Sequence, residues 1–449
     1  MSLTRNSVLL AFVLALLPAP ASAQPADLTD TAVSFRSGEH TLNGTVVAPT
    51  GAGDRPGVVI VAGAGHTRRD SYRPEAEALA RAGIAALIYD KRPGYSRATA
   101  TINDLADDAL AAAAALRGFS RVNRVGLWGH SQGGWVVPLA ASKSPEVAFV
   151  ITVGASAMDA ARTQLWSNRT YLSHAGVSER VAKPIGANLS RMLMGVGLFG
   201  DTAYDPVATL AKLRQPLLGV FADNDRSTAP GESLAAFREA LERGGNKHYS
   251  LRVVSEANHN LRRSEDGFGQ LPRTAEFAPG YVELMASWIT GGTTAAPSAD
   301  SPPAQAIRSE PVTLLAWYES PWLHVGAVVL MLLVFLAYPI IALVRRLRGR
   351  RAPAPVGWPA RFLAAGGIVT VLGSLVFLFS IVQTGATGVQ SSVLGRPLPW
   401  LLLQIAAVGV LIATVFVVVR RRAELREMML IAGAVVFVPW AAYWGLLTV

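Results

Sequence analysis

The sequence contains no cysteine. Disulfides, thiolate nucleophiles, cysteine-ligated zinc and iron–sulfur clusters are therefore excluded, and an exported domain must fold without covalent cross-links. Charged residues are also scarce, at 16% of 449 residues against 51% hydrophobic residues. Such an apolar composition is unusual for a fully soluble protein. The apolar residues are therefore expected to include segments that contact a membrane.

The excess of apolar residues lies in the last third of the chain, in four segments at about 324–344, 362–382, 400–419 and 428–447. Each has about the length of a membrane-spanning helix. None contains Asp, Glu, Lys or Arg, and their one histidine, His324, stands at an edge. Because ion and proton pathways usually need such groups, the sequence favours an anchor or assembly role over transport.

The net charge of +10 comes mainly from arginines that flank these segments. From Pro311 onward there are 11 Arg and 3 acidic residues, whereas the region 24–310 is nearly neutral. The loops after the first and third segments carry most of the arginines, and the positive-inside rule places both loops in the cytoplasm. The chain up to Glu310 then lies outside. No continuous basic surface remains, so nucleic acid is excluded as a partner.

The first 23 residues have the features of a secretory signal peptide. Arg5 precedes an apolar run at 8–17, and Ala21-Ser22-Ala23 supplies a small-residue cleavage site. The apolar run is too short to span a bilayer, which favours cleavage over an uncleaved anchor. The signal peptide and the arginine distribution thus independently place the N-terminal domain outside. With the Ala- and Arg-rich composition, they predict a multi-pass protein of a bacterial cytoplasmic (inner) membrane with a periplasmic domain.

Between residues 33 and 290, short apolar runs alternate with amphipathic segments. Continuous apolar strands separated by helices indicate an α/β fold with a mostly parallel sheet covered on both faces. The expected strands are 33–36, 41–48, 57–62, 84–89, 125–128, 147–153, 216–222 and 250–254. The expected helices are 72–82, 102–116, 132–142, 231–242 and 275–288.

Two further segments complete the expected domain organisation. Residues 155–214 interrupt the alternation and are too long for an ordinary connection. We expect a helical lid there, lined by Met192, Met194, Leu198 and Phe199, although a plain helical excursion is nearly as well supported. Residues 291–310 are rich in Gly, Thr, Ala, Pro and Ser, which predicts a linker to an all-α transmembrane domain at 324–447.

The strongest local signal is the pentapeptide Gly129-His130-Ser131-Gln132-Gly133, which lies between an expected strand and an expected helix. This G-x-S-x-G pattern marks a tight strand-to-helix turn that exposes the serine hydroxyl. Side chains two positions to either side would collide in such a turn, which explains Gly129 and Gly133. The context makes Ser131 the predicted nucleophile.

A serine hydroxyl needs a base to remove its proton, and the base needs an acid to orient it. In this strand–turn–helix context the order along the chain is serine, acid, histidine. His259 follows the last expected strand and is the predicted base, with His248 and His174 as fallbacks. Asp225 is the predicted acid because it lies in a loop, whereas Asp223 ends a strand and is the alternative that would cap the turn.

The oxyanion that forms during acyl transfer needs two backbone N–H donors. We expect one from Gln132, directly after the nucleophile, and one from Ala64, in the small-residue loop that follows the strand at 57–62. That loop matches neither of the glycine patterns that cradle nucleotide phosphates. Nucleotide binding is therefore not expected, and no cofactor or metal is required.

These motifs together resemble the α/β-hydrolase superfamily over residues 33–290, in particular its serine aminopeptidase-like, dienelactone hydrolase-like and cinnamoyl-esterase-like branch. The supporting stretches are 90–96, 129–134, 222–225 and 257–259. The resemblance implies an eight-stranded sheet and a cofactor-free triad of Ser131, His259 and Asp225 acting through an acyl-enzyme. The usual His-Gly before the oxyanion loop is Ala62-Gly63 here, and Pro93 replaces a small or polar residue. Neither change removes a catalytic side chain.

The sequence therefore predicts a periplasmic serine esterase that acts on a small-molecule or lipid-like ester. The same machinery cleaves amides and thioesters, so an aminopeptidase-like or thioesterase activity remains an alternative. A free amine would need a carboxylate, for which Glu179 and Asp201 of the expected lid are weak candidates. A catalytically silent sensor or scaffold for the membrane domain is disfavoured because the set of Ser131, Asp225 and His259 is intact.

Overall fold

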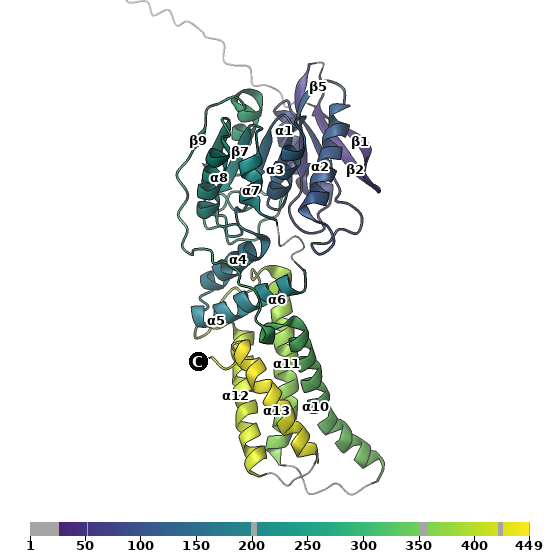
Figure 1. Cartoon of the computed structure of the whole chain (residues 1–449), viewed down its shortest axis with the longest axis vertical. Coiled ribbons are helices and arrows are strands. Elements are labelled where there is room, and N and C mark those ends of the chain that lie inside the picture. The colour runs from purple at the N-terminus through teal and green to yellow at the C-terminus, as the bar shows by residue number, and fades with distance from the viewer. Residues whose placement is uncertain (1–26, 52, 199–203, 350–356, 421–424, 449) are drawn as a thin grey trace, which may run out of the picture.

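The computed structural model describes residues 27–51, 53–198, 204–349, 357–420 and 425–448. The predicted signal peptide, residues 1–23, lies outside them. Over the described residues the chain forms an α/β domain, a group of short helices and four long helices, arranged in that order along the molecule (Figure 1). The described part of the α/β domain has one nine-stranded sheet, with the strand order β1-β2-β4-β3-β5-β6-β7-β8-β9.

The bounds of the elements follow the expected alternation. The strands are β1 (Leu28–Ser37), β2 (His40–Pro49), β3 (Arg55–Val61), β4 (Ala85–Tyr89), β5 (Val122–His130), β6 (Val150–Val153), β7 (Leu217–Ala222), β8 (Tyr249–Val254) and β9 (Ser298–Ala299). The helices of this domain are η1 (Arg69–Tyr72), α1 (Arg73–Arg81), α2 (Ile102–Arg117), α3 (Gly133–Lys143), α7 (Pro206–Lys212), α8 (Pro230–Gly244), α9 (Tyr281–Ser287) and η3 (Trp288–Gly292). The helix expected at 275–288 begins only at Tyr281, and a loop takes up the residues before it.

The sheet is mostly parallel, as expected. Strand β2 pairs antiparallel with β1 and β4, and the remaining neighbours are parallel. Alternate residues of β3 face opposite sides: Val59 and Val61 join the core under α2, α3, α7 and α8, whereas Val58 and Ile60 join the core under α1 and α9. Burial on both faces is why these strands read as continuous apolar runs.

One strand was not expected from the sequence. The two-residue strand β9 lies inside the segment 291–310, expected as a linker, and pairs with β8 at the edge of the sheet. Its Ser and Ala carry no apolar pattern that could signal a strand. Further along this segment, the backbone oxygen of Ile307 accepts a hydrogen bond of 2.7 Å from Trp166 Nε1. The segment is therefore laid against the α/β domain rather than free of it.

The described residues of the segment 155–214, which are 155–198 and 204–214, form a helical insertion between β6 and β7. Apart from α7, its helices are α4 (Ala160–His174), α5 (Glu179–Lys183), the π-helical turn η2 (Pro184–Asn188) and α6 (Leu189–Gly195). We call α4, η2, α5 and α6 the lid. They lie between the α/β domain and the long helices in Figure 1. This position makes the lid the structural bridge between the two parts of the chain.

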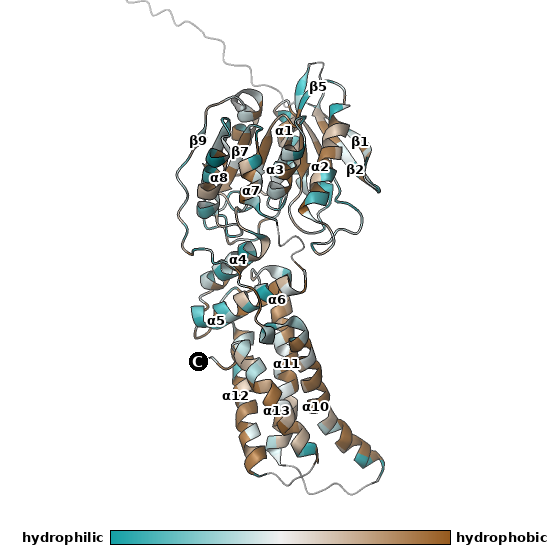
Figure 2. Cartoon of the chain, in the orientation of Figure 1, coloured by the Kyte–Doolittle hydropathy of each residue, from teal (hydrophilic) through white to brown (hydrophobic). Residues whose placement is uncertain are grey.

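Among the described residues, four helices are long and apolar enough to cross a membrane, and we call them the membrane domain. They are α10 (Pro321–Leu347), α11 (Trp358–Thr384), α12 (Leu398–Val419) and α13 (Leu425–Tyr443). Most of their residues are hydrophobic (Figure 2). The end of α10, the start of α11, the end of α12 and the start of α13 lie at the end remote from the α/β domain (Figure 1). The α11–α12 loop lies at the near end.

The lid packs on the near end of the membrane domain. Lid residues such as Leu172, Val181 and Ile185 belong to one buried apolar cluster with Trp400 and Trp444 of the membrane domain. Asn188 Nδ2 also donates to the backbone oxygen of Tyr443 at 2.7 Å. Burial of this apolar surface is what attaches the lid to the long helices.

The prediction that Met192, Met194 and Leu198 of the lid line the site is wrong, because none of the three lines the cavity that contains Ser131. Met192 is packed against the cluster shared with the membrane domain, and Leu198 is exposed. Phe199 lies outside the described residues. The long helices cover the apolar face of the lid. The local sequence does not predict this packing. The polar face of the lid remains to line the site.

Candidate active site

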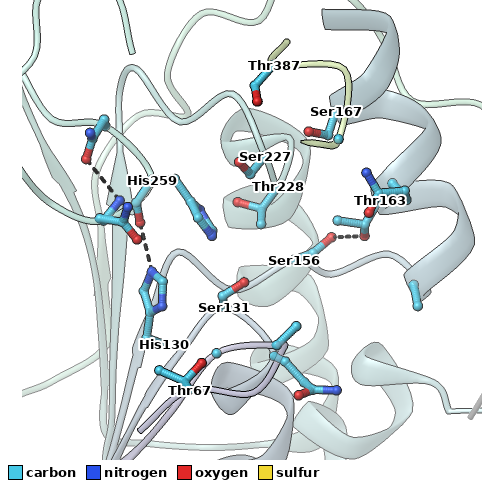
Figure 3. Close-up of a pocket in the computed structure, with 18 of the residues that line it drawn as sticks. Thr67, His130, Ser131, Ser156, Thr163, Ser167, Ser227, Thr228, His259 and Thr387 are labelled. Atoms are coloured by element: carbon cyan, nitrogen blue, oxygen red, sulfur yellow. Dashed lines mark hydrogen bonds between the residues drawn. The ribbon is translucent and has the colours of Figure 1, made fainter. Parts of the chain in front are cut away.

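Ser131 stands at a sharp turn between β5 and α3. Its φ of 53° is in the left-handed region, which costs a non-glycine residue roughly 1 kcal/mol or more. A Cβ on Gly129 would lie 2.1 Å from the Gly133 oxygen, and one on Gly133 would lie 2.3 Å from the Val61 oxygen. Both contacts are too short for any Cβ, so Gly129 allows the turn to form and Gly133 allows the start of α3 to approach the end of β3. The strained turn exposes Ser131 to the cavity in front of the sheet (Figure 3).

His259 and Asp225 meet beside this turn, although 34 positions separate them. His259 Nδ1 lies 2.8 Å from Asp225 Oδ2, and Asp225 is fully buried. Asp225 also accepts hydrogen bonds from the N–H groups of Ser227 (2.7 Å) and Thr228 (3.1 Å) and from the Thr228 hydroxyl (2.6 Å). Burial alone would raise the pKa of Asp225, but His259 and these donors hold that pKa below its ordinary value. Asp225 therefore stays ionised and holds the proton of His259 on Nδ1, which leaves Nε2 as the basic nitrogen.

Ser131 and His259 line the same cavity, and the imidazole and the hydroxyl face the same space in Figure 3. Within the described part of the chain, the Ser131 hydroxyl makes no hydrogen bond. Such catalytic contacts are often long in the absence of substrate and tighten when it binds.

The alternatives for acid and base lie elsewhere. Asp223 accepts hydrogen bonds from the N–H groups of Glu256 and Ala257, each at 3.1 Å, so it caps the turn after β8 instead of contacting His259. His174 stacks on Phe268 with ring centres 3.6 Å apart. His248 lies beside the oxygen of Ala295 at the edge of the sheet. None of the three lines the cavity that contains Ser131.

The two expected oxyanion donors, Ala64 and Gln132, both line the cavity next to Ser131. Their N–H groups donate to no acceptor among the described residues. The neighbouring Gly63 N–H is unsuitable, because it donates to Tyr72 Oη at 2.7 Å. The loop is therefore held behind the site by Gly63 and presents Ala64 towards it.

A buried polar network behind the nucleophile was not anticipated from the sequence. His130 Nδ1 contacts Tyr72 Oη at 3.0 Å and Arg273 Nη2 at 2.9 Å, and His130 Nε2 contacts the backbone oxygen of His259 at 3.0 Å. Because both partners of Nδ1 offer hydrogens, Nδ1 accepts and Nε2 carries the proton. Burial first, and Arg273 second, lower the pKa of His130 well below its usual value. His130 is therefore neutral. Through its hydrogen bond to the His259 backbone oxygen, it connects the loop that carries His259 to the end of β5, beside Ser131.

The lysine that follows β4 is a second feature that the sequence did not assign. Lys91 Nζ donates to the Gly63 oxygen at 2.5 Å and to Gln132 Oε1 at 3.1 Å. Tyr95 Oη donates to the same Gln132 oxygen at 2.8 Å. The stretch 90–96 contributes to the family resemblance. The sequence does not indicate which of its side chains reach the site.

The cavity has a volume of about 450 Å³. One wall comes from the lid helix α4, through Thr163, Gln164 and Ser167, and another from Thr384 and Gly385 of the membrane domain. Of the two acids considered for binding an amine, Glu179 pairs with Arg169 at 2.7 Å and does not line the cavity, and Asp201 lies outside the described residues. In the described ranges no three His, Asp or Glu side chains are grouped so that they could hold a metal ion.

Comparisons with known proteins agree with this architecture. The model of the prolyl oligopeptidase family matches residues 98–283, which include Ser131, Asp225 and His259. Esterase EstD of Thermotoga maritima is 24% identical over 260 residues, which cover 52% of this chain and 61% of the esterase. This chain therefore spans less than two thirds of that relative.

Solved structures with similar folds include a dienelactone hydrolase from Anabaena variabilis and an esterase from Pyrococcus furiosus. The first is 20% identical with a TM-score of 0.38 and covers 60% of this chain and 98% of its own. The second is 16% identical with a TM-score of 0.42 and covers 59% of this chain and 92% of its own. The strand order, the serine turn and the family match together show that the domain has the α/β-hydrolase fold, followed by four long apolar helices.

Proposed function

We propose that this α/β-hydrolase cleaves carboxylic esters through an acyl-enzyme on Ser131, on the periplasmic side of a bacterial inner membrane. The observation that carries the proposal is the 2.8 Å hydrogen bond between His259 and the buried Asp225, in the same cavity as the strained Ser131 turn. A serine, a histidine and an acid in these relative positions form the arrangement that activates a serine hydroxyl.

In the proposed reaction Ser131 Oγ attacks the acyl carbon while His259 Nε2 accepts its proton. Asp225 stabilises the imidazolium that forms, and the N–H groups of Ala64 and Gln132 bind the oxyanion. His259 then gives the proton to the leaving alcohol, and the acyl group remains on Ser131. Water repeats the sequence with His259 as base, which releases the acid and restores Ser131.

An aminopeptidase-like activity is the second candidate, because the matching family model is that of the prolyl oligopeptidases. A site that binds a free amine needs a carboxylate close to the scissile bond. Of the described residues that line the cavity, none is Asp or Glu. This absence, together with the similarity to an esterase, favours esters over aminoacyl peptides.

The test is fluorophosphonate labelling and 4-nitrophenyl ester turnover by the purified full-length protein. We expect Ser131→Ala to abolish labelling and to lower kcat by about 10⁴-fold or more, and His259→Ala to act similarly. Asp225→Asn should lower kcat by about 10³- to 10⁴-fold, because it loses the charge that holds the histidine tautomer. Asp223→Asn is the matched control, since Asp223 caps a turn and does not contact His259.

Labelling and turnover in wild type and Asp223→Asn alone would support the proposal. If folded wild-type protein neither reacts with fluorophosphonate nor turns over any ester or aminoacyl amide, the catalytic proposal is wrong. A silent sensor of the membrane domain would then be the better explanation. Turnover of aminoacyl amides in preference to esters would support the second candidate.

A further inference from the structure

The cavity in front of Ser131 extends to the membrane domain. Thr384 is the last residue of the membrane-spanning helix α11, and Thr384, Gly385 and Thr387 all line the cavity. Figure 3 shows Thr387 on the same side of the cavity as Ser167 of the lid, with Ser131 below them. One end of the cavity therefore lies where α11 leaves the apolar part of the molecule.

The loop that supplies this wall is held against the lid by specific contacts. Ser392 Oγ donates to the Gly176 oxygen at 2.7 Å, and the Ser178 N–H donates to the Gly395 oxygen at 2.8 Å. These bonds join the loop between α11 and α12 to the turn between α4 and α5. Because the lid is also packed on the ends of the membrane helices, the wall is a defined part of the site.

The cavity has an excess of positive charge. Among its described lining residues are Arg97 and Arg273 but no Asp or Glu. Arg273 and the buried Arg262 share a single carboxylate, Glu75. Arg97 is exposed at the rim and makes no ion pair with any residue that the structure describes. The triad acid, Asp225, is fully buried and hydrogen-bonded to His259, so it does not neutralise the rim.

The remaining lining is mixed. Trp135, Ile102 and Leu271 are apolar, whereas Gln164 and Ser167 are polar. The excess of positive charge is therefore the feature that distinguishes the cavity. We propose that this cavity binds esters that carry a negative charge, and that residues 384–387 of the membrane domain form one wall of the binding site. The proposal rests on the proposed esterase function and defines its substrate class.

The first test compares 4-nitrophenyl hemisuccinate with 4-nitrophenyl butyrate, whose acyl chains are equally long and differ by a carboxylate. We expect the full-length protein to hydrolyse the hemisuccinate with about tenfold higher kcat/KM, the effect of one charge-assisted contact. Arg97→Gln should bring this ratio close to one. Arg243→Gln, on the exposed face of α8 and outside the cavity, should keep the wild-type ratio.

The second test addresses the wall formed by the membrane domain. Thr387→Asp puts a carboxylate into the cavity and should lower the hemisuccinate-to-butyrate ratio by about tenfold. Ser391→Asp adds the same charge to the same loop outside the cavity and should leave the ratio unchanged. Equal effects of the two variants, or no preference in the wild type, would overturn the binding proposal. Ser131-dependent butyrate turnover would still stand, whereas its absence would overturn the proposed function as well.

The charged ester could come from a lipid head group or from solution. Protein reconstituted in vesicles of phosphatidylglycerol or of phosphatidylcholine separates these sources, with release of fatty acid as the readout. Faster release from phosphatidylglycerol would identify an anionic lipid head group. Preference for hemisuccinate without release from either lipid would identify a soluble anionic ester.

A separate set of contacts surrounds Lys91, behind the oxyanion loop. Its ammonium group donates to the carbonyl oxygen of Gly63 at 2.5 Å. That oxygen belongs to the same planar peptide unit as the N–H of Ala64, and in a trans peptide the two point in opposite directions. A cation on the oxygen therefore fixes the direction of the N–H and strengthens it as a donor. Lys91 also holds the side chain of Gln132, the other expected donor.

We infer that Lys91, in its charged form, is a positioning residue that orients the N–H of Ala64 and also holds the side chain of Gln132. Burial first, and the positive charge of Arg97 second, lower the pKa of Lys91 to about 7. The charged or titratable groups facing it are Arg97 and Tyr95 of its own loop, Tyr89 of β4 and Asp108 of α2. Lys91 would thus lose its proton as the pH rises through about 7. The Gly63 oxygen would then no longer contact a cation.

The test is the pH profile of kcat for wild type, Lys91→Met and Lys91→Arg. We expect Lys91→Met to lower kcat by about 10- to 100-fold with little change in KM, because the lost contact acts on the transition state. The wild-type decline of kcat above about pH 7 should be absent from Lys91→Met, and Lys91→Arg should restore part of the rate without that decline. Lys143→Met, which removes a lysine that lies at the end of α3, pairs with Asp107 of α2 and does not line the cavity, is the control.

A purely structural role for Lys91 predicts a different result. The fraction of folded protein would fall, but the pH profile of the remaining activity would match the wild type. That outcome, or an unchanged kcat in Lys91→Met, would overturn the assignment.

Discussion

At the scale of single residues, the most informative charge is the buried carboxylate of Glu75. It accepts from Arg262 Nη2 at 2.7 Å and from Arg273 Nη1 at 3.2 Å, and its side chain is 2% exposed. Burial raises the pKa of Glu75, although both arginines act in the opposite direction. A buried group of this kind is retained at a cost in desolvation, and removing one partner leaves the others uncompensated. This ion pair also positions the site, because Arg273 hydrogen-bonds His130 and His130 in turn hydrogen-bonds the backbone oxygen of His259.

Residues of the site differ in how far the sequence could identify them. Ser131, Gly129 and Gly133 lie within five positions and were recognised as one motif, although the side chain at Gly133 is excluded by the backbone of β3 and not by the turn itself. Asp225 and His259 were predicted from their order along the chain, and the structure brings them into contact. Arg273 was not predicted, because it stands in an irregular loop 143 positions from His130 and no local pattern marks it. Only the packing of that loop over α1 brings the two together.

At the scale of elements, the lid is shaped by two different neighbours. Its polar side lines the cavity, through Thr163 and Ser167 of α4, and its apolar side packs on the membrane domain, through Ile185 and Leu189. Helices with two such faces satisfy both neighbours at once. The lid therefore couples the position of the membrane helices to the shape of the site.

This coupling leads to a prediction for the buried position Ile185, which is 0% exposed. Ile185→Asp would place a carboxylate in the apolar cluster and should destabilise the lid by about 3 kcal/mol or more. We expect a lower melting temperature in detergent and a larger loss of hemisuccinate than of butyrate turnover. Ser173→Asp, on an exposed face of α4, should match the wild type in both. Equal melting temperatures for the two variants would show that the lid does not depend on this packing.

At the scale of the whole molecule, the arginine-rich ends of the long helices lie remote from the hydrolase domain (Figure 1). This arrangement supports the proposed topology, in which the hydrolase domain and the α11–α12 loop are periplasmic. In the proposed topology the cavity would lie next to the periplasmic surface of the membrane.

The absence of native cysteine makes the topology directly testable. Single-cysteine variants Ser391→Cys, in the α11–α12 loop, and Leu347→Cys, at the end of α10, can be labelled in spheroplasts with a membrane-impermeant maleimide. We expect labelling of the first variant only, and labelling of the second only after the membrane is permeabilised. The reverse pattern would place the hydrolase domain in the cytoplasm and contradict the proposed side.

The sequence by itself determined the α/β fold class, the four apolar helices, the serine turn and the order of the candidate triad. These follow from local rules: the burial period of strands and helices, the length needed to cross a bilayer, and the tight turn that excludes a side chain at Gly129. The tertiary structure alone decided which acid contacts His259, which face of the lid is covered, and that Lys91 and Thr387 reach the site. Those outcomes depend on contacts between segments far apart in the chain, and such contacts leave no periodic pattern in either segment.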